Sequence, residues 1–331
     1  MHRWKIAGRK LDEACGGSRA GTSPPPPPRG WVRVQHIISI RDFTRQDLDS
    51  FLDRAELVER GGFDPRMLEG KILALLFFEP STRTRMSFAS AMARLGGTSI
   101  SVDSVEASSI AKGETLADTI RVVSGYADAI VLRHPKEGAA RLASEFATVP
   151  VINAGDGAGQ HPSQTILDLY TIRRSMPLDG LEIGLLGDLR YGRTAHSLAH
   201  ALSLYDVTLH TIAPPGLDLP LSVVHELRRH GMEVVKHGDV GKVIRDLDVL
   251  YVTRIQRERF PDSASYYDVA SSYRITPDLL EGAREHLIVL HPLPRVDEID
   301  PAVDRTPFAR YFEQSRNGVP VRMALLQEVM G

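Results

Sequence analysis

The sequence FFEPSTRTR, at residues 77–85, joins a predicted strand to a predicted helix. The predicted strand, Lys71–Phe78, contains an unbroken apolar run, which is typical of a strand buried on both faces. Pro80 then ends this strand. A helix is predicted over Met86–Leu95, because its apolar residues suit one helix face and two glycines follow it. The stretch therefore predicts the strand-to-helix unit of an α/β fold.

The turn between this strand and this helix is rich in side chains that bind anions. It holds three hydroxyl donors and two guanidinium groups, contributed by Ser81, Thr82, Thr84, Arg83 and Arg85. A helix N-terminus adds free backbone N–H groups and the positive end of the helix dipole. Arginine also matches phosphate oxygens bidentately. The alternative is an ordinary helix cap beside two solvated arginines, but five such side chains in one turn favour a phosphate site.

Polar side chains also follow other predicted strands, at 129–132, 149–153, 183–186, 249–252 and 287–290. Arg133 follows the first of these strands, and a glycine-rich loop that leads to His161 follows the second. In open α/β sheets, ligands bind beyond the carboxyl ends of the strands. We therefore expect these loops to line a single crevice, although they lie far apart in the sequence.

The expected crevice is rich in arginine and poor in nucleophiles. His161 is a candidate for polarising a carbonyl, and six arginines are expected nearby: Arg83, Arg85, Arg133, Arg193, Arg254 and Arg295. The chain has no Gly-x-Ser-x-Gly turn, no Gly-x-x-x-x-Gly-Lys loop and no His/Cys spacing typical of zinc. We expect neither a metal nor an organic cofactor. Such a site suits direct transfer between two anionic substrates, one of which supplies the nucleophile.

Four motifs resemble the aspartate/ornithine carbamoyltransferase family. STRTR at 81–85 resembles the carbamoyl-phosphate signature of this family, and HPSQ at 161–164 resembles its His-Pro-x-Gln element. KGETLADT at 112–119 and HPLPRVDEI at 291–299 resemble the aspartate branch in particular. The resemblance covers nearly the whole chain in motif order, from about residue 34 to residue 330.

The resemblance implies a binding site for carbamoyl phosphate. The phosphate group is expected to bind Ser81, Thr82, Arg83 and Thr84. The carbamoyl end is expected to contact Arg133, His161, Gln164 and the backbone carbonyls of Leu293 and Pro294. The residues expected to act in catalysis are Arg83, Thr84, Arg133 and His161. Of these, Thr84, Arg133 and His161 would stabilise the oxyanion of a tetrahedral intermediate.

A second set of residues matches the aspartate-binding positions of the family, namely Lys112, Arg193, Arg254 and Gln256. Two arginines suit a dicarboxylate, since each guanidinium can pair with one carboxylate. Lys112 and Ser108, for which Ser109 is the alternative, match a loop that in the family enters the neighbouring subunit's active site. The resemblance therefore implies a homotrimer with shared active sites.

Glu79 is a carboxylate beside the predicted phosphate site, where it would repel an anionic substrate. We predict that it pairs with Arg193 or Arg259 and holds the two domains in a closed form. The alternative is a local salt bridge with Arg83 or Arg85.

The predicted fold class is α/β, with two domains that are each a parallel-sheet, Rossmann-like α/β sandwich and an active site in the crevice between them. Length and alternating elements support two domains, since 331 residues suit two units of about 150 residues each. We expect a carbamoyl-phosphate domain over 34–162, with a C-terminal helix at about 311–331 packing back on it. We expect an aspartate domain over 163–310, which includes a linker helix at 163–174.

Residues 1–33 differ from the rest of the chain in composition. They hold a run of five prolines and an excess of basic residues, so we expect a disordered tail. Two other interpretations stay open: a transit peptide, which the acidic residues and the proline run disfavour, and a start codon assigned too far upstream of Val34.

The composition bounds where the protein acts. A formal net charge of −2 with 25% charged residues gives no global field for nucleic acid or an anionic membrane. No apolar run approaches the ~18 residues of a membrane span. Cys15 is the only cysteine, which excludes an intrachain disulfide framework and suits a reducing cytoplasm.

The expected reaction is transfer of the carbamoyl group from carbamoyl phosphate to the α-amine of L-aspartate, in de novo pyrimidine biosynthesis. One rival is a transferase for ornithine, but that branch typically has a cysteine where this chain has Pro292. The other rival is a non-catalytic paralogue, which should have lost site residues. The sequence leaves open whether regulatory or dihydroorotase chains bind the protein.

Overall fold

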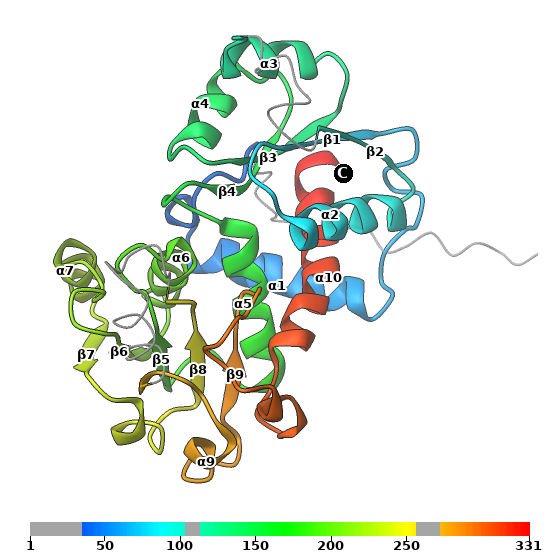
Figure 1. Cartoon of the computed structure of the whole chain (residues 1–331). Coiled ribbons are helices and arrows are strands. Elements are labelled where there is room, and N and C mark those ends of the chain that lie inside the picture. Colours follow the sequence, from blue (N-terminus) through cyan, green and yellow to red (C-terminus); the bar gives the residue numbers. More distant parts are fainter. Residues whose placement is uncertain (1–34, 103–112, 256–271) are drawn as a thin grey trace, which may run out of the picture.

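The structure is a computed structural model that describes residues 35–102, 113–255 and 272–331 (Figure 1). The described residues form two domains, each built on a parallel sheet. The prediction of two parallel-sheet α/β domains is confirmed. The predicted tail at 1–33 lies outside the described residues.

The first domain has a four-stranded parallel sheet in the order β2-β1-β3-β4. Its elements are η1 (Ile40–Asp42), α1 (Arg45–Glu59), β1 (Ile72–Phe77), α2 (Thr82–Arg94), β2 (Thr98–Val102), α3 (Leu116–Val123), β3 (Ala129–His134), α4 (Ala139–Phe146) and β4 (Val151–Asp156).

The second domain has a five-stranded parallel sheet in the order β7-β6-β5-β8-β9. Helix α5 (Pro162–Ser175) leads into it and α10 (Tyr311–Met330) follows it. The elements between these two helices are β5 (Leu181–Leu186), α6 (Arg193–Leu202), β6 (Val207–Ile212), α7 (Leu221–Arg229), β7 (Glu233–His237), η3 (Val240–Lys242), β8 (Val249–Val252), α9 (Pro277–Leu280), β9 (Ile288–Leu290) and η5 (Pro301–Arg305).

Strand β1 is apolar throughout because both of its faces are covered. Leu73, Leu75 and Phe77 pack in one cluster with residues of α1, α2 and α10. Ala74 and Leu76 point to the opposite face and pack with residues of α3 and α4. This alternation follows from the two-residue period of a strand. Burial on both faces explains why the sequence shows a continuous apolar run there.

Helices α5 and α10 join the two domains. Helix α10 packs against α1 and α2 of the first domain and lies side by side with α5 (Figure 1). Helix α5 packs in turn on β4, α6 and β9. Because one hydrophobic cluster contains residues of both sheets and of both helices, the domains share a continuous core. No helix in the described ranges is both long enough and apolar enough to cross a membrane.

In each sheet, the chain adds strands first on one side of its first strand and then on the other. In the first sheet, β1 has β2 on one side and β3 on the other, and in the second sheet β5 lies between β6 and β8. Ligands in open α/β sheets bind at such switch points, outside the carboxyl ends of the strands. The fold therefore predicts that residues after β1, β3, β5 and β8 lie at the site.

Candidate active site

Two adjoining cavities lie between the domains. The first has a volume of about 350 Å³ and the second of about 480 Å³. Arg133, Arg193, Thr194 and the loop at 291–294 line both cavities, so the two form one continuous crevice. Arg133 belongs to the end of β3 and Arg193 begins the helix after β5, as the switch points of the two sheets predict.

Helix α2 presents its N-terminus to the first cavity. The sequence predicted a helix from Met86, but α2 begins at Thr82, so the polar residues form its first turn. Ser81 is the N-cap residue, yet its side chain makes no capping hydrogen bond. The first turn consequently offers hydroxyl groups, N–H groups and positive dipole to the cavity, which Ser81, Thr82, Arg83 and Thr84 all line.

Two further helices begin at the crevice in the same way. His161 is the N-cap residue of α5 and Gly192 is that of α6, and neither provides a capping side chain. Three helix N-termini without side-chain caps give the crevice a positive potential beyond that of its arginines.

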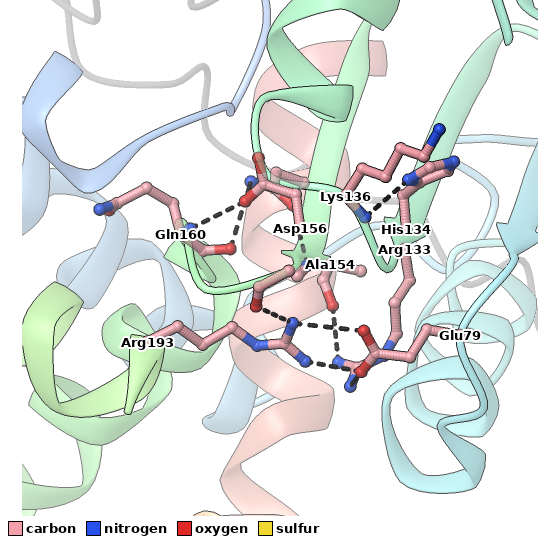
Figure 2. Close-up of polar contacts among 11 residues, drawn as sticks. Glu79, Arg133, His134, Lys136, Ala154, Asp156, Gln160 and Arg193 are labelled. Carbon is pink, nitrogen blue, oxygen red and sulfur yellow. Dashed lines mark hydrogen bonds and ion pairs between the residues drawn. The ribbon is translucent and has the colours of Figure 1, made fainter. Parts of the chain in front are cut away.

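Glu79 forms ion pairs with two arginines of the crevice (Figure 2). Its Oε1 lies 2.8 Å from Nη2 of Arg193, and the same oxygen contacts Arg133. Both arginines are also anchored to the backbone, since Arg133 donates to the Ala154 carbonyl at 3.0 Å and Arg193 to that of Gly157 at 2.6 Å. Glu79 thus contacts a first-domain arginine and a second-domain arginine at once.

The single carboxylate of Glu79 offsets only part of the positive charge of Arg133 and Arg193. Burial opposes ionisation of Glu79, but Arg193 and Arg133 outweigh it and hold the pKa of the carboxyl below its usual value. Burial lowers the pKa of Arg133 to about 10, with Arg193 adding to the effect and Glu79 opposing it. The crevice therefore favours an incoming anion, which would relieve the remaining repulsion between the arginines.

His161 lines the first cavity and is buried. Burial, then Arg133, Arg193 and Arg322, hold its pKa well below the usual value. The imidazole is accordingly neutral at physiological pH and can donate one hydrogen bond to a ligand oxygen. Its Nδ1 lies 3.4 Å from the Ser163 hydroxyl.

The side chain of His291 stabilises the loop at 291–294 through two hydrogen bonds. The Nδ1 of His291 accepts from the Leu293 N–H at 2.8 Å, and its Nε2 lies 2.6 Å from Oε1 of Glu298. Leu293 has a φ of 57°, an uncommon conformation for a residue other than glycine, and precedes a cis peptide bond to Pro294. The hydrogen bonds of His291 therefore fix an unusual backbone whose residues line both cavities.

The structure brings most of the predicted site residues together. All nine residues predicted to hold carbamoyl phosphate line the first cavity, and Arg193 and Arg254 line the second. Four other predicted residues fall outside the described part of the chain: Ser108, Lys112, Gln256 and Arg259.

Neither Arg85 nor Arg295 lines the two cavities, contrary to the sequence prediction. Arg295 is turned to another part of the chain. Its guanidinium pairs with Asp304 and donates to the Tyr311 hydroxyl at 3.0 Å. The prediction for Arg295 was wrong because position along the chain does not fix the direction of a side chain in an irregular loop.

Sequence reasoning missed Arg322, which reaches the first cavity from α10. The residue is 3% exposed, and burial lowers its pKa to about 10. Its Nε has no hydrogen-bond partner among the described residues. A charged residue within the apolar stretch at 319–326 was the available signal, because arginine is seldom buried without a function or a partner.

Comparison with known proteins agrees with this geometry. Residues 35–174 match the family described as "Aspartate/ornithine carbamoyltransferase, carbamoyl-P binding domain". Residues 179–329 match the companion description, "Aspartate/ornithine carbamoyltransferase, Asp/Orn binding domain". The two matches divide the chain within a few residues of the end of α5.

Similar proteins include two curated archaeal relatives. The aspartate carbamoyltransferase catalytic subunit of Methanoculleus marisnigri is 80% identical over 297 residues, which are 90% of this chain and 100% of that protein. The catalytic subunit of Methanosphaerula palustris is 71% identical over the same shares of both chains.

Solved structures show the same fold. The catalytic subunit of M. jannaschii aspartate transcarbamoylase superposes with a TM-score of 0.85 at 51% identity, covering 89% of this chain and 98% of that one. Aspartate transcarbamoylase from Trypanosoma cruzi, in complex with N-(phosphonacetyl)-L-aspartic acid, gives 0.85 at 40% identity, covering 90% and 96%.

Proposed function

Since the chain belongs to the aspartate/ornithine carbamoyltransferase family, we propose that it transfers the carbamoyl group of carbamoyl phosphate to the α-amine of L-aspartate. The products are N-carbamoyl-L-aspartate and phosphate, and the reaction serves pyrimidine biosynthesis. One observation carries the proposal. The anion-binding N-terminus of α2 shares a cavity with Arg133 and His161, and that cavity continues into one lined by Arg193 and Arg254.

Carbamoyl phosphate fits the first cavity by charge and by hydrogen bonding. Its phosphate would take the N–H and hydroxyl donors of the first turn of α2, with Arg83 as the pairing guanidinium. Its carbonyl oxygen would accept from Thr84, Arg133 and the neutral imidazole of His161. These groups are held in place before the substrate arrives, so they need little reorganisation during the reaction.

The transfer needs no nucleophile from the protein. The neutral α-amine of aspartate attacks the carbonyl carbon, forming a C–N bond and a tetrahedral intermediate whose oxyanion faces the same three donors. The C–O bond to phosphate then breaks. The leaving phosphate takes the proton released by the amine, so charge and atoms balance without a side-chain base.

The second cavity supports aspartate as the acceptor. Arg193 and Arg254 both line it, and two guanidinium groups match the two carboxylates of aspartate. Ornithine carries a cationic side chain, which two arginines would repel. We assign Lys112 and Gln256 to the same substrate on the basis of the family resemblance.

The test is release of phosphate from carbamoyl phosphate with aspartate or ornithine as acceptor. We expect turnover with aspartate and none above the rate of spontaneous hydrolysis with ornithine. Detection of N-carbamoyl-L-aspartate by mass spectrometry would identify the product. Equal rates with and without aspartate would overturn the proposal.

We further propose that the protein is a homotrimer in which Lys112 and Ser108 serve a neighbouring subunit's site. Exposed apolar side chains of the first domain support an interface there. Met86, Ile100 and Tyr126 are 63%, 41% and 63% exposed. Ile100 and Tyr126 line one surface hollow of about 310 Å³, which Val102 at the end of β2 also lines. Such exposed apolar surface often marks a protein–protein contact.

We also propose bounds for the two domains and a cellular compartment. We place the carbamoyl-phosphate domain at 34–162, completed by a C-terminal helix at 311–331, and the aspartate domain at 163–310. The packing of α10 on α1 and α2 supports this division. The single cysteine supports the reducing cytoplasm as the compartment.

A further inference from the structure

A network of hydrogen bonds behind the first cavity centres on Asp168, which is fully buried in α5. Its Oδ1 accepts from Nε2 of Gln164 at 2.8 Å and from Nε2 of Gln314 at 2.7 Å. Its Oδ2 accepts from the Tyr251 hydroxyl at 2.9 Å. The donors belong to α5, α10 and β8, so one carboxylate joins the linker helix, the C-terminal helix and the second sheet.

The carboxylate fixes which way both glutamine amides face. An ionised carboxyl group can only accept hydrogen bonds, so each glutamine must turn its NH₂ group towards it. An independent contact gives the same orientation for Gln314, because its Oε1 accepts from the His291 backbone N–H at 2.8 Å. The Nε2 of Gln164 is likewise used by Asp168. The carbonyl oxygen of Gln164 is therefore left as an acceptor, on a side chain that lines the first cavity.

The second arm of the network reaches the loop at 291–294. Gln314 holds the N–H of His291, and His291 in turn accepts from the N–H of Leu293. These contacts support the backbone that presents the carbonyl groups of Leu293 and Pro294. Asp168 thus supports two groups of hydrogen-bond acceptors at the same cavity. One is the side-chain oxygen of Gln164, and the other is the pair of carbonyl groups in the loop at 291–294.

Acceptors at this place recognise a particular feature of the substrate. The NH₂ group of carbamoyl phosphate donates two hydrogen bonds, whereas the methyl group of acetyl phosphate, at the same position, donates none. A site whose acceptors lose contact with water when the substrate binds rejects an analogue that lacks the matching donor. We propose that Asp168 is a positioning residue that gives the site its selectivity for the carbamoyl NH₂ group, by orienting Gln164 and supporting the loop at 291–294.

This inference rests on the proposed function and identifies which residues make the site selective for carbamoyl phosphate. The test compares the wild-type protein with Asp168→Asn, which keeps the shape of the side chain. An amide has one acceptor oxygen and no charge. If its NH₂ group faces the two glutamines, they lose their acceptor. If it faces Tyr251, whose hydroxyl can accept, a neutral oxygen holds both glutamines more weakly than the carboxylate does, so Gln164 is held less firmly in either case.

The control is Thr171→Val, one turn further along α5. Oγ1 of Thr171 accepts from Nδ2 of Asn317 in α10 at 3.0 Å, so this change also removes a buried hydrogen bond between α5 and α10. It does not touch Gln164 or the loop. A loss of general packing would affect both variants, whereas a loss of selectivity should affect only Asp168→Asn.

The measurements are kcat/KM for carbamoyl phosphate with aspartate and the inhibition constants of acetyl phosphate and inorganic phosphate. They are made at pH 8, where Asp168 is largely ionised, since burial raises its pKa to about 7 against the opposing hydrogen bonds of Gln314, Tyr251 and Gln164. In Asp168→Asn, we expect kcat/KM to fall by about tenfold or more and both inhibition constants to stay within about twofold. Thr171→Val should keep the wild-type selectivity.

A folded Asp168→Asn protein with unchanged selectivity for carbamoyl over acetyl phosphate would overturn the inference. If that variant does not fold, Gln314→Met decides. It keeps the carboxylate but removes the link to His291, so unchanged selectivity there would overturn the inference as well. A wild-type protein without transferase activity would instead overturn the proposed function.

Discussion

Oε1 of Glu79 lies 2.8 Å from Nη2 of Arg193, in an ion pair that crosses from the first domain to the second. The same carboxylate pairs with Arg133. Glu79 therefore links the arginine proposed for the carbamoyl group to one proposed for aspartate. The position of one domain relative to the other therefore depends on the negative charge of Glu79, which lies inside the site.

Glu79→Gln should remove the ion pair that holds the two domains together at the site. The change keeps the shape of the side chain but leaves Arg133 and Arg193 facing each other without a counter-charge. We expect kcat/KM for aspartate to fall by about tenfold or more, since a partly buried charge pair is lost. Steady-state kinetics would measure this. Arg141→Ala, which breaks an exposed pair with Asp42, is the control and should change activity by less than about twofold. Wild-type kinetics in a folded Glu79→Gln protein would contradict the domain-closing role.

Arg83→Ala should lower turnover far more than it lowers stability. Loss of a charge-assisted contact to the leaving phosphate is worth roughly 2–4 kcal/mol in the transition state, or about a hundredfold in rate. Arg94→Ala, at the exposed end of the same helix, controls for changes in helix charge. Near-normal activity in folded Arg83→Ala would show that the phosphate site has been assigned to the wrong residue.

Arg254→Ala should weaken the use of aspartate and leave the binding of carbamoyl phosphate almost unchanged. Arg254 lines the second cavity only, whereas the residues assigned to the phosphate group, Ser81–Thr84, line the first cavity only. We expect KM for aspartate to rise by more than about tenfold, as for loss of one ion pair to a carboxylate. Arg229→Ala, on the exposed face of α7, is the control. Calorimetry in which both affinities fall together would mean that Arg254 is wrongly placed.

Mixing inactive subunits tests the proposed homotrimer. Lys112→Ala and His161→Ala chains should each be inactive alone. In mixed trimers, some sites would combine an intact Lys112 from one chain with an intact His161 from another, so activity should partly return. Mass spectrometry of the intact assembly would verify that subunits exchange. Exchange without any return of activity would show that sites are not shared.

The neutral state of His161 should make stability depend on pH. The folded protein keeps the pKa of His161 well below 6.5, because of burial and then the neighbouring arginines, whereas the unfolded chain binds a proton near pH 6.5. More protons bind to the unfolded state below that pH. The free energy of unfolding should therefore decrease as pH falls below 6.5, by up to about 1.4 kcal/mol per pH unit for this group.

His161→Asn removes this dependence and leaves the contributions of other histidines in place. Urea unfolding of both proteins at pH 8, 6 and 5 would measure the difference. We expect the wild type to lose more stability than the variant between pH 6 and pH 5, and the difference between them to be constant above pH 7. Parallel pH profiles would mean that His161 can take up a proton in the folded state.

Local sequence determined the turn for which we propose phosphate binding. Ser81, Thr82, Arg83 and Thr84 are adjacent in the chain, and the strand before them and the helix after them have clear patterns. The helix boundary was nonetheless misjudged by four residues, since polar side chains in a first turn resemble a loop in sequence. The apolar runs likewise predicted two parallel sheets, because strands buried on both faces need continuous apolar sequence.

Only the tertiary structure decided which distant side chains meet. The sequence left open whether Glu79 pairs locally or across the domains, and the packing of the domains brings it to Arg193. The direction of Arg295 towards Asp304, the entry of Arg322 from α10 and the network around Asp168 leave no periodic signal in the sequence. Periodicity reports which face of an element is buried, whereas a contact between elements depends on how their faces are oriented in space. The sequence by itself thus determined the fold class and the proposed phosphate-binding turn, and tertiary packing decided how the two halves of the site are joined.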